Sequence, residues 1–460
     1  MSRPGRPLEG AALPSIFSNR TEALAALLAL GGLLALFLIP STPATPAGLA
    51  MMVAGFALRP VFALPILGAI LPSYLMPRQI GSLTFSLPEL VLVCAVAGAL
   101  LHTSPRIIRR QLPPLAQLAT PFDGPIALLL AAALTSLLAS ELLRVSLREL
   151  RTLILEPVAA FYLAAWLVRD RRDLALLGIG VLAGGLAAAG LGLYQYFFTS
   201  HVVAVEGARR ILGPYLSPNH LGLYLGRVLP MALAGALFLP RFRVAWLAAA
   251  AILTFAILLT FSLGAWVASF FAAVTVFALW DGRRALALAG AGVALMVAGV
   301  AAFRPERIVQ HFSASGGTGF IRVQLWQSSL RMALDHPVLG VGLDNFLYHY
   351  RDSYLQAGAS AEPNLSHPHN IFLQFWLQMG ILGLASLLWL MVALFQLWRR
   401  LWAGAPSPFQ RACLAAIAGA LVDLLLHGMV DNSYFLVDLA YQFWLAAGVL
   451  AVMARRGEMK

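Results

Sequence analysis

The sequence predicts an all-α polytopic integral membrane protein, with about 12–14 transmembrane helices and one large external loop that contains short helices. Three observations predict this fold class. Hydrophobic residues make up 60% of the 460 residues and charged residues only 11%, whereas a soluble protein carries about 25% charged residues. The mean hydropathy is +0.80. Apolar runs of helix length follow one another along most of the chain, which excludes a string of soluble domains.

The expected transmembrane helices are apolar runs close to the length of about 20 residues that crosses a bilayer. The stretch 47–71 is interrupted by Arg59-Pro60, so it forms either one kinked helix or two short ones. The run 22–39 is expected to be the first membrane helix, because it is too long for the core of a removable signal. All other runs lie near 87–102, 122–139, 152–168, 174–198, 218–239, 243–260, 263–280, 284–303, 370–398, 409–427 and 433–454.

The basic residues predict which loops face the cytoplasm. The net charge is +12, and Lys460 is the only lysine, so nearly all of the positive charge is arginine. Short loops with clustered arginines alternate along the chain and are expected on the cytoplasmic side with the basic C-terminus. The loops 199–217 and 304–369 then lie outside. No basic stretch is interleaved with aromatic residues on a soluble module, so no nucleic-acid partner is expected.

We expect N-terminal transmembrane helices in residues 1–200 and a second transmembrane region in residues 201–460, which includes the external loop 304–369. Ionisable residues are concentrated in this loop. A membrane protein that gathers its ionisable groups in one loop is expected to carry out its chemistry there. Five of the nine histidines lie in it, namely His311, His336, His349, His367 and His369.

The loop ends with Ser-His-Pro-His-Asn at 366–370, directly before an apolar run. An imidazole of His367 or His369 can act as a general base near neutral pH. Alternatively, the segment is only the start of a helix, with Asn370 as its capping residue. We expect no metal site and no cofactor, because no carboxylate or cysteine is adjacent to the two histidines in the sequence.

Three ionisable residues repeat at helical spacing near the end of the run 409–427. Asp423, His427 and Asp431 occur at i, i+4 and i+8, which places them on one helical face. A carboxylate in this row could orient a catalytic imidazole. Equally, the three side chains could line a hydrated crevice.

Several arginines are candidates for binding an anionic substrate. Arg322 begins a predicted amphipathic helix at 321–334 and could bind a diphosphate, because guanidinium pairs with phosphate oxygens in a planar fork. The alternative is a surface ion pair with Glu306. Arg227 lies about 13 Å into the helix that starts near residue 218, where an arginine should face the interior of the bundle. Arg210 lies just upstream, in the loop 199–217.

Several short motifs, in this order, resemble the O-antigen ligase/polymerase superfamily over roughly residues 205–440. They are Ser-Pro-Asn-His-Leu-Gly-Leu-Tyr-Leu at 217–225, Leu-Thr-Phe-Ser-Leu-Gly-Ala-Trp at 259–266, Arg322 followed by Leu325-Trp326, His336-Pro337 followed by Gly340-Val341-Gly342, and His-Pro-His-Asn at 367–370 followed by Gly-Ile-Leu-Gly at 380–383.

The resemblance implies a glycosyltransferase of the bacterial inner membrane, metal-independent and inverting. Such enzymes take a glycan from undecaprenyl diphosphate at the extracytoplasmic leaflet and transfer it to lipid A core, to another glycan or to a protein. By position, Arg322 would hold the donor diphosphate, and His369, or else His367, would activate the acceptor hydroxyl. Asp431 would support the histidine, and Arg210 and Arg227 would add positive field at the diphosphate.

One residue departs from the pattern that the resemblance implies. Family members usually carry an arginine after the serine of the second motif, and here this position is Leu263. The missing arginine adds a catalytically silent relative to the open interpretations. The other three are an O-antigen ligase, a polymerase that uses a glycan acceptor, and a transporter or flippase of lipid-linked glycan. A transporter would carry ionisable residues at mid-membrane depth on several helices, whereas here they gather at the rim.

Overall fold

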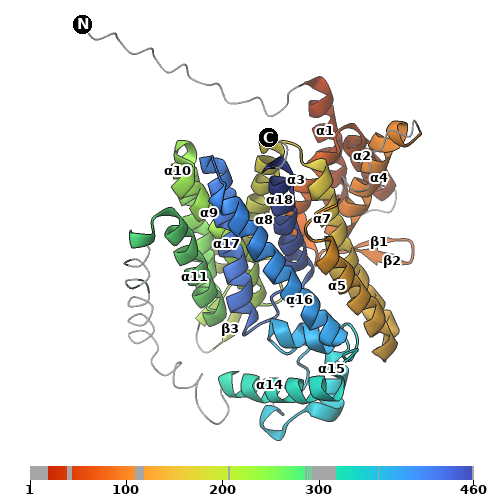
Figure 1. Cartoon of the computed structure of the whole chain (residues 1–460), viewed down its shortest axis with the longest axis vertical. Helices are drawn as coiled ribbons and strands as arrows, with labels where there is room; N and C mark the ends of the chain where they lie inside the picture. Colours follow the sequence, from red (N-terminus) through yellow and green to blue (C-terminus); the bar gives the residue numbers. More distant parts are fainter. Residues whose placement is uncertain are drawn as a thin grey trace. The chain divides into compact units, whose positions relative to one another are not determined.

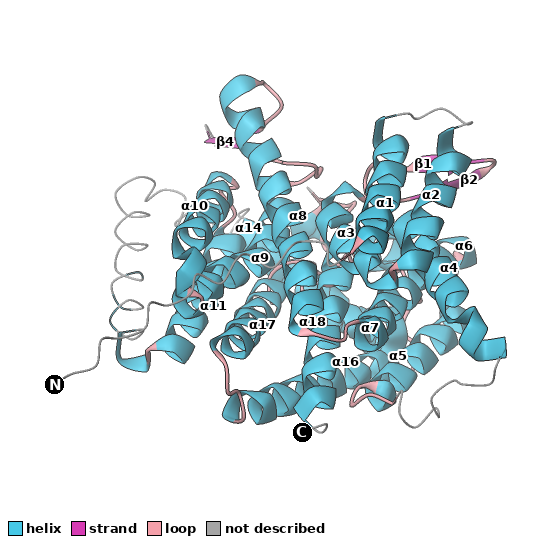
Figure 2. Ribbon diagram, turned by 90° about the horizontal axis from the view of Figure 1, so that it is seen from above, coloured by secondary structure: helices cyan, strands magenta, loops and turns pink. Residues whose placement is uncertain are grey.

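The computed structural model describes residues 19–38, 44–108, 119–205, 208–284, 318–360 and 362–457, and isolated positions 287, 290 and 292. The predicted all-α polytopic fold is confirmed. Figure 2 shows that helices make up nearly all of the described chain. Among the described residues, strands occur only in two short antiparallel hairpins. These are β1 (Arg78–Ile80) with β2 (Leu83–Phe85), and β3 (Val203–Val205) with β4 (Ala208–Arg210).

The chain forms two compact units, of which unit 1 comprises residues 1–63 and 93–111. It contains α1 (Arg20–Leu38), α2 (Ala44–Leu58), η1 (Pro60–Phe62) and the part of α4 (Leu87–Ile108) that follows Leu92. Helices α1 and α2 approach closely through glycines, as small residues allow in membrane helix pairs. A Cβ on Gly55 would lie 2.8 Å from the backbone nitrogen of Ala29.

Unit 2 comprises residues 64–92 and 112–460 and carries the described part of the polar loop 304–369 and all the candidate site residues. Its first helices are α3 (Ala63–Ile70), η2 (Leu71–Ser73), α5 (Asp123–Ser136), η4 (Leu137–Ala139), α6 (Leu143–Glu149), the π-helical turn η5 (Leu150–Leu155), α7 (Glu156–Leu167) and α8 (Arg171–Phe198). Then follow α9 (Pro218–Phe238), η6 (Pro240–Phe242), α10 (Arg243–Leu259), α11 (Leu263–Trp280), α14 (Thr318–Asp335), α15 (Phe346–His349), the π-helical turn η7 (Tyr350–Tyr354), η8 (Ala357–Ala359), α16 (Ile371–Ala403), α17 (Pro408–Gly428) and α18 (Val437–Gly457).

Ten described helices are long and apolar enough to cross a membrane, and three shorter apolar helices accompany them at Thr45–Leu58, Pro60–Ser73 and Asp123–Ala139. The stretch 47–71 is therefore two short helices, because the chain leaves helical geometry at Arg59, where φ is −145°. The expected run 284–303 falls almost entirely outside the described residues.

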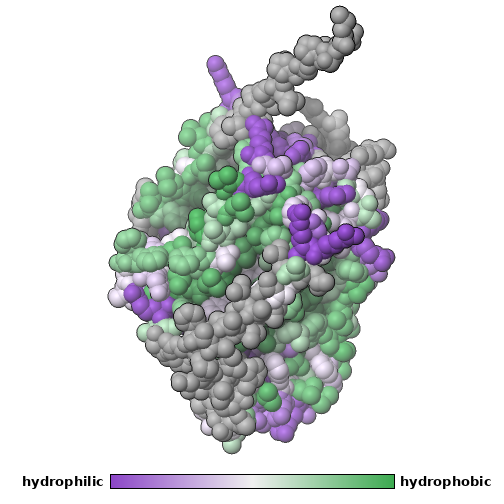
Figure 3. Space-filling view, turned by 90° about the vertical axis from the view of Figure 1, so that its left-hand side faces the viewer, coloured by the Kyte–Doolittle hydropathy of each residue, from purple (hydrophilic) through white to green (hydrophobic). Residues whose placement is uncertain are grey.

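The outer helices expose apolar side chains, as membrane helices do. On α10, Val244 is 82% exposed and Leu247 is 52% exposed. Figure 3 shows a broad apolar surface, with hydrophilic residues gathered in patches. Helices α9 and α18 are different, because most of their residues are buried inside the protein. Polar groups on these two helices therefore face other helices rather than lipid.

The segment around α14 docks onto a kink in α16, and Figure 1 shows α14 lying crosswise at the end of α16. The kink is at Gly380, where φ is +65°. The nitrogen of Val341 donates to the carbonyl of Leu377 at 2.7 Å, and the nitrogen of Ile381 donates to the carbonyl of Pro337 at 2.9 Å. A Cβ on Gly340 would lie 2.8 Å from the nitrogen of Gly380. Two glycine motifs of the sequence thus form one backbone contact.

The sequence also predicted the local course of this segment. The expected amphipathic helix at 321–334 is α14, which starts three residues earlier and ends at Asp335, directly before His336-Pro337. A glycine turn follows, with positive φ at Gly340 and Gly342. A second contact then fixes the segment to α6, since Asn345 Nδ2 donates to Ser146 Oγ at 2.7 Å.

Candidate functional site

Two loops meet at the end of unit 2 where α9, α16 and α18 begin and α17 finishes, called here the site end. The first loop is 366–370, which precedes α16, and the second is 429–436, which connects α17 to α18. Asn370 joins them. Its Oδ1 accepts hydrogen bonds from the nitrogens of Phe372 and Leu373, both at 3.1 Å, and its Nδ2 donates to the carbonyl of Met429 at 3.3 Å. The expected capping role of Asn370 is confirmed.

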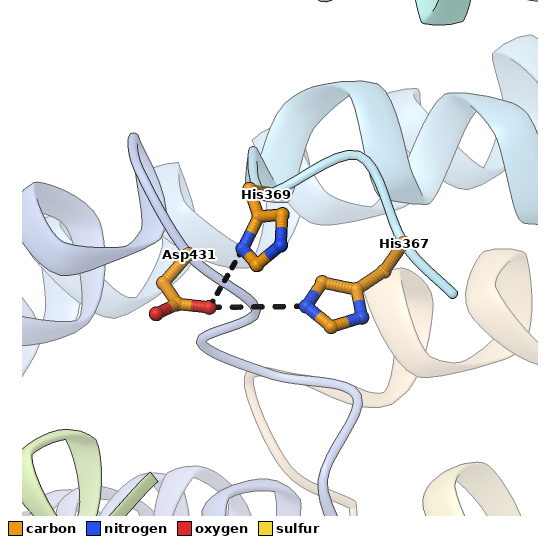
Figure 4. A group of neighbouring side chains, drawn as sticks. All are labelled: His367, His369 and Asp431. Carbon is orange, nitrogen blue, oxygen red and sulfur yellow. Dashed lines mark hydrogen bonds and ion pairs between the residues drawn. The ribbon is translucent and has the colours of Figure 1, made fainter. Parts of the chain in front are cut away.

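His369 and Asp431 lie at the centre of this junction, as Figure 4 shows. Nδ1 of His369 is 2.9 Å from Oδ1 of Asp431. The Asp431 side chain is 8% exposed and that of His369 is 18% exposed. Of the three ionisable residues predicted at helical spacing, Asp431 is therefore the one that contacts the imidazoles.

The hydrogen bond between these two groups decides which atom donates and which accepts. Burial alone would raise the pKa of Asp431, but its contacts with His367 and His369 hold it well below its usual range. The carboxylate is therefore ionised at neutral pH and can only accept a hydrogen bond. Nδ1 of His369 is therefore the donor to Asp431, and the other ring nitrogen, Nε2, points away from this bond. No described residue is hydrogen-bonded to Nε2, so this nitrogen is available to accept a proton.

His367 occupies a weaker position beside the same carboxylate. Its Nε2 is 3.8 Å from Oδ1 of Asp431, while its Nδ1 is 2.9 Å from Oγ of Ser366. The rings of His367 and His369 are 4.2 Å apart. Burial, followed by the neighbouring His369, lowers the pKa of His367. His367 is therefore neutral at pH 7, and its weaker carboxylate contact makes it the poorer base of the two.

Among the described residues, His367, His369 and Asp431 form a group that could hold a metal ion. Their ligand atoms lie within 4.8 Å of one another. The sequence-based reason against a metal was the lack of a carboxylate, and Asp431 provides one. Its Oδ1, however, already accepts from His369 at 2.9 Å and from the nitrogen of Asn432 at 2.8 Å. The geometry is that of an imidazole oriented by a carboxylate.

Arg322 lies in the first half of α14 and is half-buried. Its positive charge is among the influences that lower the pKa of His367, after burial and His369. Arg322 forms no ion pair within the described part of the chain, and Glu306, its expected alternative partner, lies outside that part. The charge of Arg322 therefore acts at His367, one of the two imidazoles.

Arg227 lies beneath the loop 429–436 and is 6% exposed. Its guanidinium donates to the carbonyl of Leu439 at 3.0 Å and to the carbonyl of Ser433. The bond to Ser433 holds the loop that carries Asp431, and the bond to Leu439 holds the first turn of α18. The guanidinium of Arg227 is thus bonded to backbone oxygens on both sides of the start of α18.

Arg210 lies on β4 and is also engaged with neighbouring groups. Its Nε donates to the carbonyl of Thr260 at 2.7 Å, and a terminal nitrogen donates to Oδ1 of Asn219 at 2.8 Å. Arg210 therefore ties the turn before α11 to the start of α9. This turn leads to Leu263, the first residue of α11, which is 42% exposed. A Cβ on the next residue, Gly264, would lie 3.0 Å from Nε2 of His427.

The other histidines of the polar loop lie elsewhere. The rings of His336 and His349 are 5.6 Å apart, and Nε2 of His349 is 3.6 Å from Oε1 of Glu141. His311 lies outside the described residues. Of the histidines in this loop that the structure describes, only His367 and His369 contact Asp431.

The sequence did not indicate a second polar cluster at the site end. Asp438 accepts a hydrogen bond from the hydroxyl of Tyr215 at 2.7 Å and contacts Nε2 of His220 at 3.0 Å. The hydroxyl of Tyr74 is 3.5 Å from Nδ1 of His220. The sequence signal that could have predicted this cluster is Asp438 itself. It is a lone carboxylate in the first turn of an apolar helix, and such an acid needs a buried partner.

Residues 248–388 match a family model described as O-Antigen ligase. The matched stretch includes Leu263, Arg322, His367 and His369 and ends before Asp431. No curated protein matches the chain.

Proposed function

Because the chain belongs to the O-antigen ligase/polymerase superfamily through its residues 248–388, we propose that it is a membrane glycosyltransferase of the O-antigen ligase type. It moves a glycan from an undecaprenyl-diphosphate carrier to an acceptor on the extracytoplasmic face of the bacterial inner membrane. The single observation that carries this proposal is the hydrogen bond between His369 Nδ1 and Asp431 Oδ1 at 2.9 Å.

In the proposed reaction, Nε2 of His369 takes the proton of an acceptor hydroxyl. The hydroxyl oxygen attacks the anomeric carbon of the glycan from the face opposite the diphosphate. The bond between this carbon and the diphosphate oxygen breaks, and the carrier diphosphate leaves as an anion with the electron pair. The configuration at the anomeric carbon is inverted. Asp431 stabilises the imidazolium that forms at His369.

Positive charge from arginine supports departure of the diphosphate. Arg322 binds the diphosphate oxygens, since its guanidinium is without an ion pair among the described residues and its charge acts at His367. Arg227 and Arg210 contribute field from positions where their nitrogens already bind protein oxygens. With three arginines in these roles, the mechanism that we propose needs no metal.

The acceptor separates two versions of the proposal. A ligase transfers the glycan to lipid A core or to another non-carrier acceptor, and a polymerase transfers it to a second glycan. Both use the same base and the same donor site. In both versions His369 takes the hydroxyl proton and Arg322 binds the diphosphate. These residues therefore do not distinguish a ligase from a polymerase.

The test is transfer by the purified protein in lipid vesicles, with undecaprenyl-diphosphate-linked glycan, candidate acceptors and EDTA. The wild type is expected to convert carrier-linked glycan to product, and His369→Ala is expected to lose this activity. His336→Ala is the matched control, because His336 lies on the same segment but contacts His349 rather than Asp431. Movement of intact lipid-linked glycan between leaflets, without transfer, would contradict the proposal and indicate a flippase.

A further inference from the structure

A groove with a volume of about 640 Å³ lies between the second half of α14 and the chain at 353–357. Binding sites for small ligands have volumes of about 300–1,000 Å³. Its polar lining includes Arg331 and Asp335 from α14, and Tyr354 and Gln356 from the facing chain. None of these four residues contributes to the site around His369.

Hydrogen bonds hold the polar lining of the groove in place. The hydroxyl of Tyr354 donates to Oδ2 of Asp335 at 2.8 Å. Nε2 of Gln356 donates to the carbonyl of Gln324 at 3.0 Å and to Oγ of Ser328 at 3.1 Å. Ser328 in turn donates to the carbonyl of Tyr354 at 2.7 Å. The two walls are therefore joined, and a ligand would meet side chains that are already ordered.

Several groups in the groove are left for a ligand. Oδ1 of Asp335 and Oε1 of Gln356 have no hydrogen-bond partner among the described residues, and Arg331 has no ion pair there. Burial, followed by the contact with Asp335, raises the pKa of Tyr354 to about 12, so its phenol stays neutral. Leu334 is 61% exposed at the same place. The groove thus offers acceptors, a cationic donor and an apolar side chain.

This mixture fits a neutral polyhydroxylated ligand. Sugar hydroxyls both donate and accept, so they can pair with the carboxylate, the amide oxygen and the guanidinium together. The C–H faces of a sugar ring suit the exposed Leu334 and the ring of Tyr354. A free phosphate or an anionic lipid headgroup is a poorer fit, because it would meet the carboxylate of Asp335 beside Arg331.

A small hydrophobic core fixes the groove to α16, the helix that follows the loop 366–370. Leu325 and Met332 of α14 are fully buried with Leu377 of α16, and Tyr354 packs against the same cluster. Helix α16 starts two residues after His369. Arg331 lies nine residues beyond Arg322 on α14, about 14 Å along the helix axis. The groove therefore has a fixed position relative to both predicted substrate contacts.

We propose that the groove lined by Arg331, Asp335 and Tyr354 is a carbohydrate subsite, which binds sugar residues of the glycan away from the reacting bond. This inference rests on the proposed function, because it assigns the groove to the same substrate. It goes beyond that function by predicting that the protein recognises the body of the glycan as well as its diphosphate end.

Binding of a free oligosaccharide tests the subsite without catalysis. The probe is the oligosaccharide released from the donor by acid cleavage of its diphosphate linkage, added to the protein in lipid nanodiscs and followed by saturation-transfer NMR. Arg331→Ala and Asp335→Asn are expected to weaken its binding about tenfold, equivalent to about 1.4 kcal/mol. Arg351→Ala is the matched control, an exposed arginine on the same segment that pairs with Asp352 outside the groove. Equal affinity in the wild type and both groove variants would overturn the subsite.

Transfer kinetics separate failure of the subsite from failure of the proposed function. Donors with one repeat unit and with many repeat units are compared in the vesicle assay. A subsite predicts that Arg331→Ala raises KM more for the long donor than for the short one. Identical changes for both donors would overturn it. A wild type that transfers neither donor would contradict the proposed function, while the NMR measurement would still decide whether the groove binds the oligosaccharide.

Discussion

His369 reaches Asp431 from a backbone in the left-handed region, with φ at +50°, and the two side chains are 2.9 Å apart. Such a conformation in a non-glycine residue costs roughly 1–3 kcal/mol and persists only where surrounding contacts impose it.

The first prediction concerns the contact between His369 and Asp431. Asp431→Asn should lower the rate of glycan transfer about 100-fold or more, because an amide can donate to Nδ1 and move the proton to Nε2.

The measurement is kcat for transfer with saturating donor, compared with that of His367→Ala. The His367 variant should lose much less activity, because its contact with Asp431 is 3.8 Å long. If the two substitutions reversed this order, His367 would be the base. If Asp431→Asn kept full activity, the oriented-imidazole mechanism would be wrong.

The second prediction concerns stability at low pH. Burial, followed by His369, lowers the pKa of folded His367 below its ordinary value of 6.5. As the pH falls below 6.5, the unfolded chain therefore binds a proton at this residue before the folded protein does. The free energy of unfolding then decreases over this window. Thermal unfolding in nanodiscs should show a smaller loss below pH 6.5 for His367→Gln than for the wild type. Parallel curves for the two proteins would contradict this assignment.

The third prediction tests the docking of α14 on the kink in α16. A Cβ on Gly380 would lie 2.8 Å from the nitrogen of Leu339, and φ at Gly380 is +65°. Gly380→Ala should therefore lower the free energy of unfolding by roughly 1–3 kcal/mol. Gly190→Ala on α8 is the control, since a Cβ there meets nothing within 4 Å, and it should be neutral or slightly stabilising. Equal melting temperatures for Gly380→Ala and the wild type would show that the contact is not needed.

Much of this fold was predictable because its signals are local. Apolar runs predicted the spanning helices, and the amphipathic pattern at 321–334 predicted α14. The polar sequence before residue 371 gave the cap at Asn370. Each of these features depends on residues within a few positions of one another. The interruption at Arg59 was also visible, although only the structure decided between a kink and two helices.

Contacts between distant segments were not predictable in the same way. The spacing of Asp423, His427 and Asp431 predicted a common helical face, which is wrong for Asp431 because α17 ends at Gly428. Which of the three meets His369 depends on where α17 ends, since Asp431 follows the last turn and is free to approach the loop before α16. The cluster of His220, Asp438 and Tyr215 joins residues more than 200 positions apart, and sequence spacing contains no information on such a contact.

The fourth prediction concerns Arg322 and the donor. Arg322→Ala should raise KM for the lipid-linked glycan about tenfold or more, because one bidentate contact to the diphosphate is lost. Folding should stay intact, since Arg322 forms no ion pair in the described part of the chain. Arg322→Lys should recover only part of the affinity, because an ammonium lacks the planar fork. Unchanged KM and kcat in Arg322→Ala would remove the proposed role in donor binding.

The last prediction concerns Leu263, where the resemblance leads us to expect an arginine. Leu263 is the first residue of α11 and is 42% exposed, so a longer side chain fits without displacing buried neighbours. The adjacent Gly264 approaches His427, which places position 263 at the site end. If the diphosphate binds there, Leu263→Arg should lower KM for the donor and raise transfer several-fold through added positive charge. Leu263→Met, which adds length without charge, is the matched control. A wild type without activity that gains transfer in Leu263→Arg would identify the natural chain as catalytically silent, whereas equal kinetics in all three proteins would mean that position 263 does not contact the donor.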